Sequence, residues 1–338
     1  MSDGHCAVDR KEFIMCTCID FKTKDHYFGR NMDLEYRFDE KVVITPKNYR
    51  LSLKNGSSIC TKYAMIGMAC VRDCYPLYAD ATNEKGLSMA GLNFPNSAHF
   101  CSPDSPGFHL CPHELIPYFL GLCSTVAEIR PLLADLTIVD QSLMPDLPVA
   151  SLHWMISDAR ECIVLEQMES GLKVYDNPVG ILTNDPPFNY HLCNLNSYMN
   201  LTPDYGKNRF SDKLNLKQYG MGMGAIGLPG DASPTSRFVK AAFCKCNSVC
   251  CEDEESSVTQ FFHVLDSVSV VKGSTLTQTG QEELTLYSCC ANTAKGIYYY
   301  RTYNNSQITA IRMTNREKFR NTLSVYNLID TQQIRYLN

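Results

Sequence analysis

The chain has no long apolar stretch: none of its segments approaches the roughly eighteen uninterrupted apolar residues of a transmembrane helix. Residues 1–14 also lack the apolar region of a secretory signal. The net charge is small: the chain has 31 Lys and Arg residues and 36 Asp and Glu residues, which give a formal net charge of −5. A chain without an excess of positive charge shows no sign of binding nucleic acid or an anionic membrane. We therefore expect a cytoplasmic protein that acts on a small molecule.

Regular cysteine spacing is absent as well, although the 338 residues include 17 cysteines. In a long chain without a signal segment, most of these thiols are expected to be reduced. The most closely spaced group has no histidine nearby and is too compact for a zinc ribbon or finger; it comprises Cys244, Cys246, Cys250 and Cys251. No cofactor or metal is expected, and a thiol-rich redox or metal-binding protein is a distant alternative.

Motifs for nucleotide binding and for histidine-based catalysis are weak. The glycines at 222, 224 and 227 match the dinucleotide-binding spacing, but they follow no predicted strand and lead into Pro229 instead of a helix. The eight histidines show no H-E-x-x-H spacing. A Cys-His dyad stays open as an alternative, because its two members need to be adjacent only in space.

Apolar periodicity and turn clusters divide the chain into expected strands and helices. Strands are predicted at 41–45, 63–71, 87–94, 151–157, 162–168, 172–175, 284–289, 297–303 and 308–313. Helices are predicted within 112–136, at 234–243 and at 259–268, and residues 183–237 look loop-rich. With no repeat, linker or low-complexity tract, residues 16–338 are expected to form a single α+β domain.

A thiol, a guanidinium and a carboxylate lie within eighteen residues near the start of the chain, at Cys16, Arg30 and Asp33. Two runs rich in β-branched and aromatic residues, 15–21 and 27–33, are separated by a polar segment and predict a hairpin. In a hairpin, Arg30 and Asp33 return to the side of Cys16. A cationic neighbour lowers the pKa of a thiol from about 8.5, so Cys16 is the candidate nucleophile.

Met15-Cys16-Thr17, followed by Phe28-Gly29-Arg30-Asn31-Met32-Asp33, resembles the start of the choloylglycine hydrolase family of bile salt hydrolases and penicillin V acylases. These N-terminal nucleophile hydrolases begin, when mature, at the cysteine. The resemblance continues through nearly the whole chain after residue 14. Residues 86–94 resemble the family strand with an oxyanion-hole asparagine, here Asn93. Residues 182–186 are similar to the loop with the second asparagine, here Asn184, and residues 230–238 to the segment with the second arginine, here Arg237.

The resemblance implies a four-layer αββα sandwich of two antiparallel sheets flanked by helices, usually assembled as a homotetramer. It also implies hydrolysis of a linear amide through an acyl thioester on Cys16. The α-amine of Cys16, with a pKa of about 7.7–8.0, would serve as the base. Asp33 would hold this amine, and Asn93 and Asn184 would donate to the oxyanion. For Arg30 and Arg237, taken as isolated residues, the alternative is an ordinary surface arginine.

Substrate preference is inferred from the residue at position 93. Asn93 after Gly91-Leu92 resembles the bile salt hydrolase version of the strand, where penicillin V acylases often have tyrosine. The expected substrates are glycine- and taurine-conjugated bile acids, with penicillin V or another N-acyl amide as the alternative. A steroid needs a wide apolar pocket, which Met32, Leu34 and Phe94 are expected to line; core packing is the alternative for all three.

Residues 1–15 depart from the family pattern, since such family members typically begin Met-Cys. An amide nitrogen at Cys16 cannot act as a base. We expect residues 1–15 to be a leader or an upstream extension that is removed or disordered, or else Met15 to be the true start.

Overall fold

The structure is a computed structural model that describes residues 15–145 and 147–338. The predicted leader therefore lies, except for Met15, outside the described residues. Within the described part of the chain, no helix is both long and apolar enough to cross a membrane.

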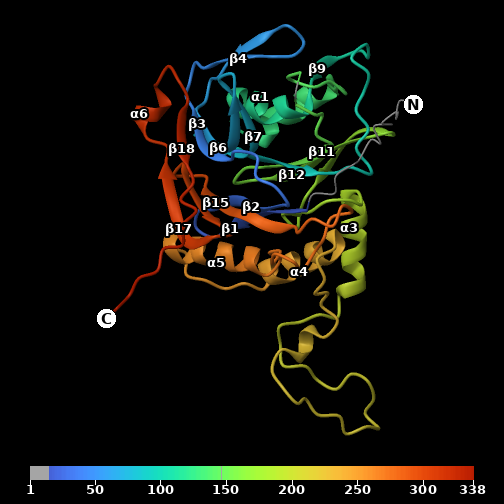
Figure 1. Ribbon diagram of the computed structural model, residues 1–338. Helices are drawn as coiled ribbons and strands as arrows, with labels where there is room; N and C mark the ends of the chain where they lie inside the picture. Colours follow the sequence, from blue (N-terminus) through green and yellow to red (C-terminus); the bar gives the residue numbers. More distant parts are fainter. Residues whose placement is uncertain (1–14, 146) are drawn as a thin grey trace, which may run out of the picture.

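Two antiparallel sheets pack face to face at the centre of the molecule (Figure 1). Within the described residues, the first sheet has six strands in the order β14 (Ile181–Leu182), β1 (Cys16–Lys22), β2 (His26–Leu34), β15 (Leu284–Asn292), β16 (Ile297–Thr302) and β17 (Asn305–Arg312). The second has eight, in the order β13 (Gly171–Asp176), β12 (Cys162–Met168), β11 (Leu152–Ser157), β8 (Ser88–Asn93), β7 (Tyr75–Asn83), β6 (Met65–Arg72), β3 (Lys41–Thr45) and β18 (Ser324–Asn327).

Helices cover the outer face of each sheet and complete the four layers (Figure 1). α1 (Leu115–Leu122) lies on the eight-stranded sheet, and α2 (Val126–Ile129) packs in the same hydrophobic cluster. α4 (Pro234–Cys246) and α5 (Glu254–Asp266) lie on the six-stranded sheet, and α3 (Phe188–Leu195) packs beside α4. The remaining elements are α6 (Asn315–Lys318) and the short strands β4 (Arg50–Ser52), β5 (Ser58–Cys60), β9 (Phe108–Leu110) and β10 (Leu136–Ile138). The predicted α+β, αββα sandwich is confirmed.

Every residue of β2 is buried, because this strand is central in its sheet and covered on both faces. One face packs against the helices: on the neighbouring strand β1, Phe21 meets Phe261 of α5 with the ring centres 6.2 Å apart. At Gly29 a Cβ atom would overlap the carbonyl oxygen of Cys289 in β15. The glycine of the Phe28-Gly29-Arg30 motif thus permits the close approach of β2 and β15. The next residue, Arg30, is buried between the two sheets.

Several predicted elements differ from the structure. The 183–237 segment is not all loop, since it contains α3, and the sequence analysis missed β7 and β18. In the segment 125–136, Thr125 caps α2 as predicted by accepting from the Glu128 backbone N–H at 3.3 Å. The α-helix ends at Ile129 because Pro131 lacks the N–H that the next turn requires, and a 3₁₀ turn and then β10 follow.

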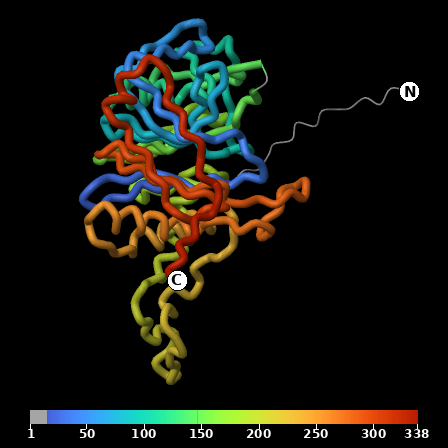
Figure 2. The backbone as a smooth tube through the Cα atoms, turned by 60° about the vertical axis from the view of Figure 1, so that its left-hand side comes forward, coloured from blue at the N-terminus to red at the C-terminus, as the bar shows by residue number. Residues whose placement is uncertain are grey.

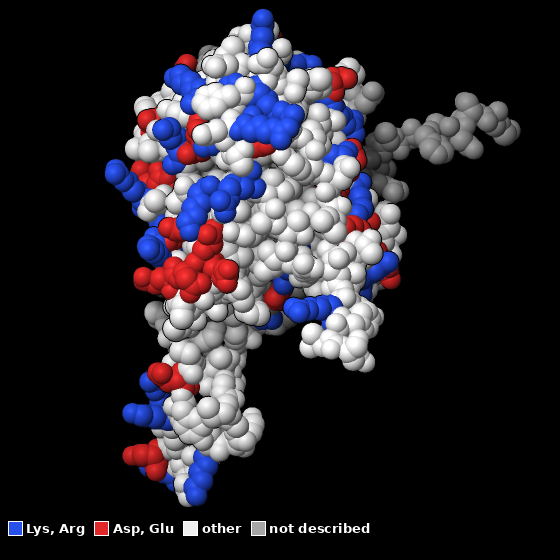
Figure 3. Space-filling view, turned by 90° about the vertical axis from the view of Figure 1, so that its left-hand side faces the viewer, with Lys and Arg blue, Asp and Glu red and all other residues white. Residues whose placement is uncertain are grey.

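Between α3 and α4 the chain leaves the body of the protein, and residues 199–230 are here called the arm. Figures 1 and 2 show the arm projecting beyond the helical layer of the six-stranded sheet. On the face in Figure 3, Lys and Arg side chains lie among Asp and Glu side chains, both on the body and on the arm. This mixture agrees with the near balance of charge in the sequence.

Candidate active site

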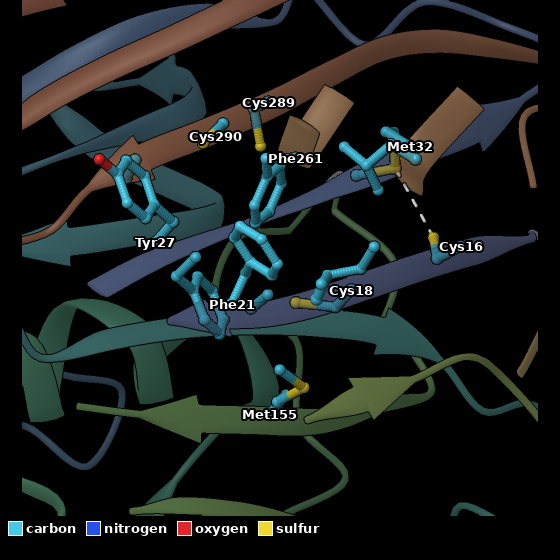
Figure 4. Close-up of a cluster of buried hydrophobic side chains, with 14 of the residues drawn as sticks. Cys16, Cys18, Phe21, Tyr27, Met32, Met155, Phe261, Cys289 and Cys290 are labelled. Atoms are coloured by element: carbon cyan, nitrogen blue, oxygen red, sulfur yellow. Dashed lines mark hydrogen bonds between the residues drawn. The ribbon is translucent and has the colours of Figure 1, made fainter. Parts of the chain in front are cut away.

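The predicted hairpin is confirmed, and it sets Cys16 in the middle of a polar group. Cys16 is the first residue of β1, and the register pairs it with Met32 and pairs Cys18 with Arg30. The Cys16 thiol is directed at the thioether of Met32, with Sγ and Sδ 3.9 Å apart (Figure 4). Because strand side chains alternate, Cys16 and Cys18 lie on the same face of β1, toward the eight-stranded sheet.

Asn184 and Arg237 fix the backbone of Cys16. The Cys16 N–H donates to Asn184 Oδ1 at 2.9 Å, and Arg237 Nη2 donates to the same oxygen at 2.7 Å. Arg237 Nη1 donates to the Cys16 carbonyl and, at 2.8 Å, to Thr17 Oγ1. Arg237 is 2% exposed, so it is not a surface arginine. The start of α4 and the loop after β14 therefore meet at the first residue of β1.

Arg30 is also fully buried, which rules out the surface alternative for it. Its Nη1 donates to the carbonyl of Gly91 in β8 at 2.5 Å and to the carbonyl of Ala79 in β7 at 3.2 Å. The arginine thus bridges the two sheets, and these two partners are neutral.

Asn93 lies at the end of β8, where its carbonyl accepts from Asn184 Nδ2 at 2.8 Å. Both predicted oxyanion-hole residues are therefore joined to each other and, through Asn184 Oδ1, to Cys16. Asn93 and Asn184 are 7% and 4% exposed, so the group lies away from bulk solvent.

Asp33 is buried with half of its carboxylate unpaired. Oδ1 accepts from Thr285 Oγ1 at 2.5 Å, whereas Oδ2 has no hydrogen-bond partner among the described residues. Burial raises the pKa of the Asp33 carboxyl to about 6, although Arg237, Thr285 and Arg30 oppose the shift. A buried oxygen of this kind can receive a cationic donor, as the predicted contact with an amine requires.

Glu283 is a site residue that the sequence analysis missed. Its Oε1 accepts from the backbone N–H of Met15 at 2.8 Å, and burial raises its pKa to about 7, with a contribution from the nearby Asp33. In the sequence it adjoins Glu282, which pairs with Lys272 at the surface. No motif or spacing distinguishes the two glutamates, so only the fold identifies Glu283.

The predicted lowering of the Cys16 pKa is wrong for the chain with Met15 attached. Burial raises the pKa of the Cys16 thiol, and it outweighs the opposing effects of Arg30 and Arg237. Arg30 is nonetheless the strongest group that favours the thiolate. The sequence identified Arg30 as a cation near the thiol, but it did not reveal how completely the folded protein removes water from the thiol.

The expected pocket residues are all buried. Met32 contacts the Cys16 sulfur, and Leu34 is 4% exposed at the end of β2. Phe94 stacks on His153, with the ring centres 4.3 Å apart, and His153 in turn bonds Glu166 at 2.9 Å. Core packing thus accounts for Phe94, and the substrate-pocket role of the three residues stays a prediction.

The alternatives that involve histidine or metal gain no support from the described residues. There, the side-chain hydrogen bond of the Cys16 sulfur is to Met32, while His191 bonds the Asn184 carbonyl at 2.9 Å through Nε2. The cysteines of residues 15–145 and 147–338 are free thiols, and no cluster of three or more metal-ligand side chains occurs there.

A cavity of about 870 Å³ lies at the far end of β1, around Asp20, Lys22 and Lys245. Its lining includes none of the six residues predicted to be catalytic. The predicted site therefore does not coincide with this cavity.

Residues 16–329 match the sequence model of the family described as linear amide C-N hydrolases, choloylglycine hydrolase family. The chain belongs to this family. It is 44% identical over 324 residues to a bile salt hydrolase/transferase of Lactiplantibacillus plantarum, an alignment that covers 96% of this chain and 100% of the relative. A bile salt hydrolase/transferase of Clostridium perfringens is 39% identical over 333 residues, which covers 96% of this chain and 100% of that one.

Solved structures of a conjugated bile acid hydrolase and of a penicillin V acylase share the fold of this chain. A variant of the conjugated bile acid hydrolase of Clostridium perfringens superposes with a TM-score of 0.89 and 38% identity, over 96% of this chain and 100% of that chain. Penicillin V acylase from Agrobacterium tumefaciens shares the fold, with a TM-score of 0.71 and 20% identity over 94% of each chain. The N-terminal nucleophile hydrolase fold is thus confirmed.

Glu283 makes stability depend on pH while Met15 is attached. The unfolded carboxyl releases its proton near its ordinary pKa of 4.5, but the folded chain retains the proton up to about pH 7. The folded state binds more protons in this interval, so the free energy of unfolding falls as pH rises through it. Glu283→Gln should flatten this decline in urea denaturation series, measured in a Cys16→Ala background whose mass confirms that Met15 is retained.

Glu282→Gln is the matched control, since that neighbouring carboxylate pairs with Lys272 at the surface. An equal flattening by both variants, or by neither, would contradict the assigned role of Glu283 burial.

Proposed function

We propose that this choloylglycine hydrolase cleaves the amide bond of glycine- and taurine-conjugated bile acids, with Cys16 as the nucleophile. The observation that carries the proposal is the convergence of Asn184, Arg237 and Met32 on Cys16 at the first position of the family match. The substrate class is supported by the near full-length similarity to proteins named bile salt hydrolase and conjugated bile acid hydrolase.

The proposed reaction begins once Met15 is removed and the nitrogen of Cys16 becomes a primary amine. With a pKa of about 7.7–8.0, this amine accepts the proton of the Cys16 thiol near neutral pH. The thiolate attacks the amide carbon, and the amine then passes the proton to the departing nitrogen of glycine or taurine. Water hydrolyses the resulting thioester, which releases the bile acid and restores the thiol.

The surrounding residues act by charge and by orientation in this proposal. Arg30 favours the thiolate that burial disfavours, and the unpaired Oδ2 of Asp33 accepts from the new amine. Arg237 holds Asn184, whose Oδ1 already accepts from the Cys16 nitrogen. Asn184 Nδ2 donates to the Asn93 carbonyl before substrate binds, so the oxyanion must share or replace that acceptor.

Penicillin V or another N-acyl amide is the second candidate substrate. The likeness to a penicillin V acylase concerns the fold alone, whereas Asn93 favours the bile acid class through the resemblance of its strand. Bile acids also require an apolar pocket, and Met32 beside the sulfur is suited to line it.

The substrate assignment is tested with glycocholate, taurocholate and penicillin V offered separately to the mature enzyme. We expect release of glycine and taurine, and a loss of nearly all turnover in Cys16→Ser, because a hydroxyl is a much weaker nucleophile for this base. Cys18→Ala is the matched control, since Cys18 is a buried thiol on the same face of β1 and should be dispensable.

Hydrolysis of penicillin V alone would overturn the substrate proposal. A dead Cys18→Ala together with an active Cys16→Ser would instead overturn the choice of nucleophile.

We also propose that residues 1–15 are removed before the enzyme works, because the base is the nitrogen that Met15 acylates. Intact mass measurement of active protein should then show a chain that begins at Cys16. A chain that starts at Met15 is compared with the full chain. Each should become active only when its N-terminal residue is Cys16, and the two mature proteins should then have equal activity. Full activity with residues 1–14 still attached would exclude the α-amine as base.

A homotetramer is the assembly that we propose, with the arm in its interface. The arm exposes a group of large apolar side chains that a protein in water seldom leaves uncovered. They are Met199, Tyr205, Phe210, Leu214, Leu216, Tyr219, Met221 and Ile226, of which Phe210 and Tyr219 are 82% and 89% exposed. A second copy of the chain would cover them.

Light scattering of the mature protein should give the mass of four copies. Phe210→Asp combined with Tyr219→Asp should lower the mass, because each places a charge in the proposed interface. The control is Val249→Asp combined with Val271→Asp, which alters exposed apolar residues outside the arm. A monomeric wild type, or an unchanged mass in the arm variant, would refute this assembly.

A further inference from the structure

Arg30 lies at the point where the hydrogen-bonded ladder between β7 and β8 of the eight-stranded sheet ends. The ladder between β7 and β8 pairs Asp80 with Ala90 and continues toward Thr82 and Ser88. In the other direction the next pair would be Ala79 with Gly91, but this pair is not part of the ladder. The carbonyls of Ala79 and Gly91 accept instead from one atom, Arg30 Nη1 of the facing sheet. The guanidinium is thus held by two backbone groups at the end of this ladder.

A β-bulge in β7 makes the Ala79 carbonyl available. Opposite β6, Met68 pairs with Asp80 and Ala69 pairs with Tyr78, so Ala79 is the additional residue between two consecutive pairs. A bulge reverses the usual alternation of faces. Tyr78 accordingly packs in the cluster beneath α1, whereas Asp80, only two residues later, faces the six-stranded sheet. The position of the bulge therefore determines what Arg30 can contact.

Asp80 ties this bulge to the opposite sheet. Its Oδ2 accepts from the hydroxyl of Tyr287 in β15 at 2.9 Å, and its Oδ1 accepts from the hydroxyl of Tyr298 in β16 at 2.6 Å. The thiol of Cys289 is 3.5 Å from Oδ1. Asp80 and both tyrosines are buried, with at most 2% exposed. Three donors on a carboxylate in such surroundings make a strong and specific contact between sheets.

We propose that Asp80, Tyr287 and Tyr298 form a clamp between the sheets that positions Arg30 for the chemistry of Cys16. Asp80 is a positioning residue in this account, because it acts on the reacting thiol only through the bulge and the guanidinium. The clamp also supplies negative charge near a buried cation that has neutral hydrogen-bond partners. The inference rests on the proposed function insofar as Cys16 is taken as the nucleophile.

The clamp predicts a specific effect on the Cys16 thiol. With Met15 attached, the charged groups that act on this thiol are Arg30 and Arg237, which favour the thiolate, and Asp33, which opposes it. In the proposed mature enzyme the α-amine of Cys16 is a further charged group, and it is the same in every variant compared. If the Tyr298 hydroxyl is lost, Oδ1 of Asp80 loses its shortest hydrogen bond. The Tyr287 hydroxyl and the Cys289 thiol remain as donors, so the bulge is held less firmly. Arg30 then moves from its position near Cys16, so the thiolate loses stabilisation and the thiol pKa rises.

The test compares Tyr298→Phe with Tyr78→Phe in the mature enzyme. Tyr78 is a buried tyrosine on the other face of β7, where its hydroxyl bonds Thr45 Oγ1 at 2.9 Å. The Tyr78 hydroxyl also donates to the Val43 carbonyl at 3.3 Å. Each variant removes one buried hydroxyl, and Tyr78→Phe should lower stability at least as much as Tyr298→Phe. Only Tyr298→Phe should reduce kcat by about tenfold with KM within about twofold, because it displaces a group that is needed in the transition state.

The second measurement does not depend on substrate. The rate of alkylation of Cys16, followed by mass spectrometry of its N-terminal peptide across pH, reports the apparent pKa at which the thiolate forms beside the α-amine of the same residue. In Tyr298→Phe the midpoint of this profile should move up by about one pH unit, while Tyr78→Phe should match the wild type. Asp80→Asn should produce a shift in the same direction, which provides a second variant if Tyr298→Phe fails to fold.

An unchanged alkylation profile in both folded clamp variants would overturn the proposal. So would equal losses of kcat in Tyr298→Phe and Tyr78→Phe, because these would reflect stability alone. If the wild type hydrolyses no conjugated bile acid but the profile still shifts, the proposed substrate fails and the clamp stands.

Discussion

The hydrogen bond from the Cys16 nitrogen to Asn184 Oδ1 is the contact on which the site depends. It joins the first residue of β1 to the loop after β14, and Arg237 of α4 donates to the same oxygen. Through Asn184 Nδ2 the connection reaches β8 in the other sheet. One amide side chain thereby links three layers of the sandwich around a single backbone nitrogen. The mechanism requires this nitrogen to become a free amine without a change of place.

This arrangement places charged side chains in the interior of the protein, where loss of water destabilises their ionised forms. Arg30, Arg237 and Asp33 are each at most 2% exposed, and the pKa values of Asp33 and Glu283 are raised to about 6 and about 7. With Met15 attached, the site has buried carboxyl groups without an α-amine beside them, and burial favours the protonated thiol. A positive α-amine at Cys16 would stabilise the ionised form of Asp33. In the proposed mechanism, removal of Met15 would thus convert surroundings that disfavour ionisation of the thiol and of Asp33 into surroundings that favour it.

Much of this account could be predicted from local patterns, and the remainder depends on tertiary packing. Alternating apolar residues and turn residues were sufficient to predict β3, β12 and the β1–β2 hairpin. Arg237 was predicted from the resemblance of residues 230–238 to the family segment, and the structure shows that it is buried. α3 was missed because its polar residues resemble the loop that follows it. Glu283 and the clamp at Asp80 depend on residues distant in the chain and on a bulge. The direction of the Cys16 pKa shift also needed the packed structure, since desolvation has no sequence signature.

Isolation of the acyl enzyme tests directly whether Cys16 is the nucleophile. Mature protein is mixed with a conjugated bile acid, quenched in acid within the first turnover and digested, and the peptide that begins at Cys16 is weighed. The account predicts the added mass of the bile acyl group on this peptide, bound through sulfur and released by hydroxylamine at neutral pH. An acyl group on a different residue, or rapid turnover by a Cys16→Ser variant without any acylated peptide, would contradict it.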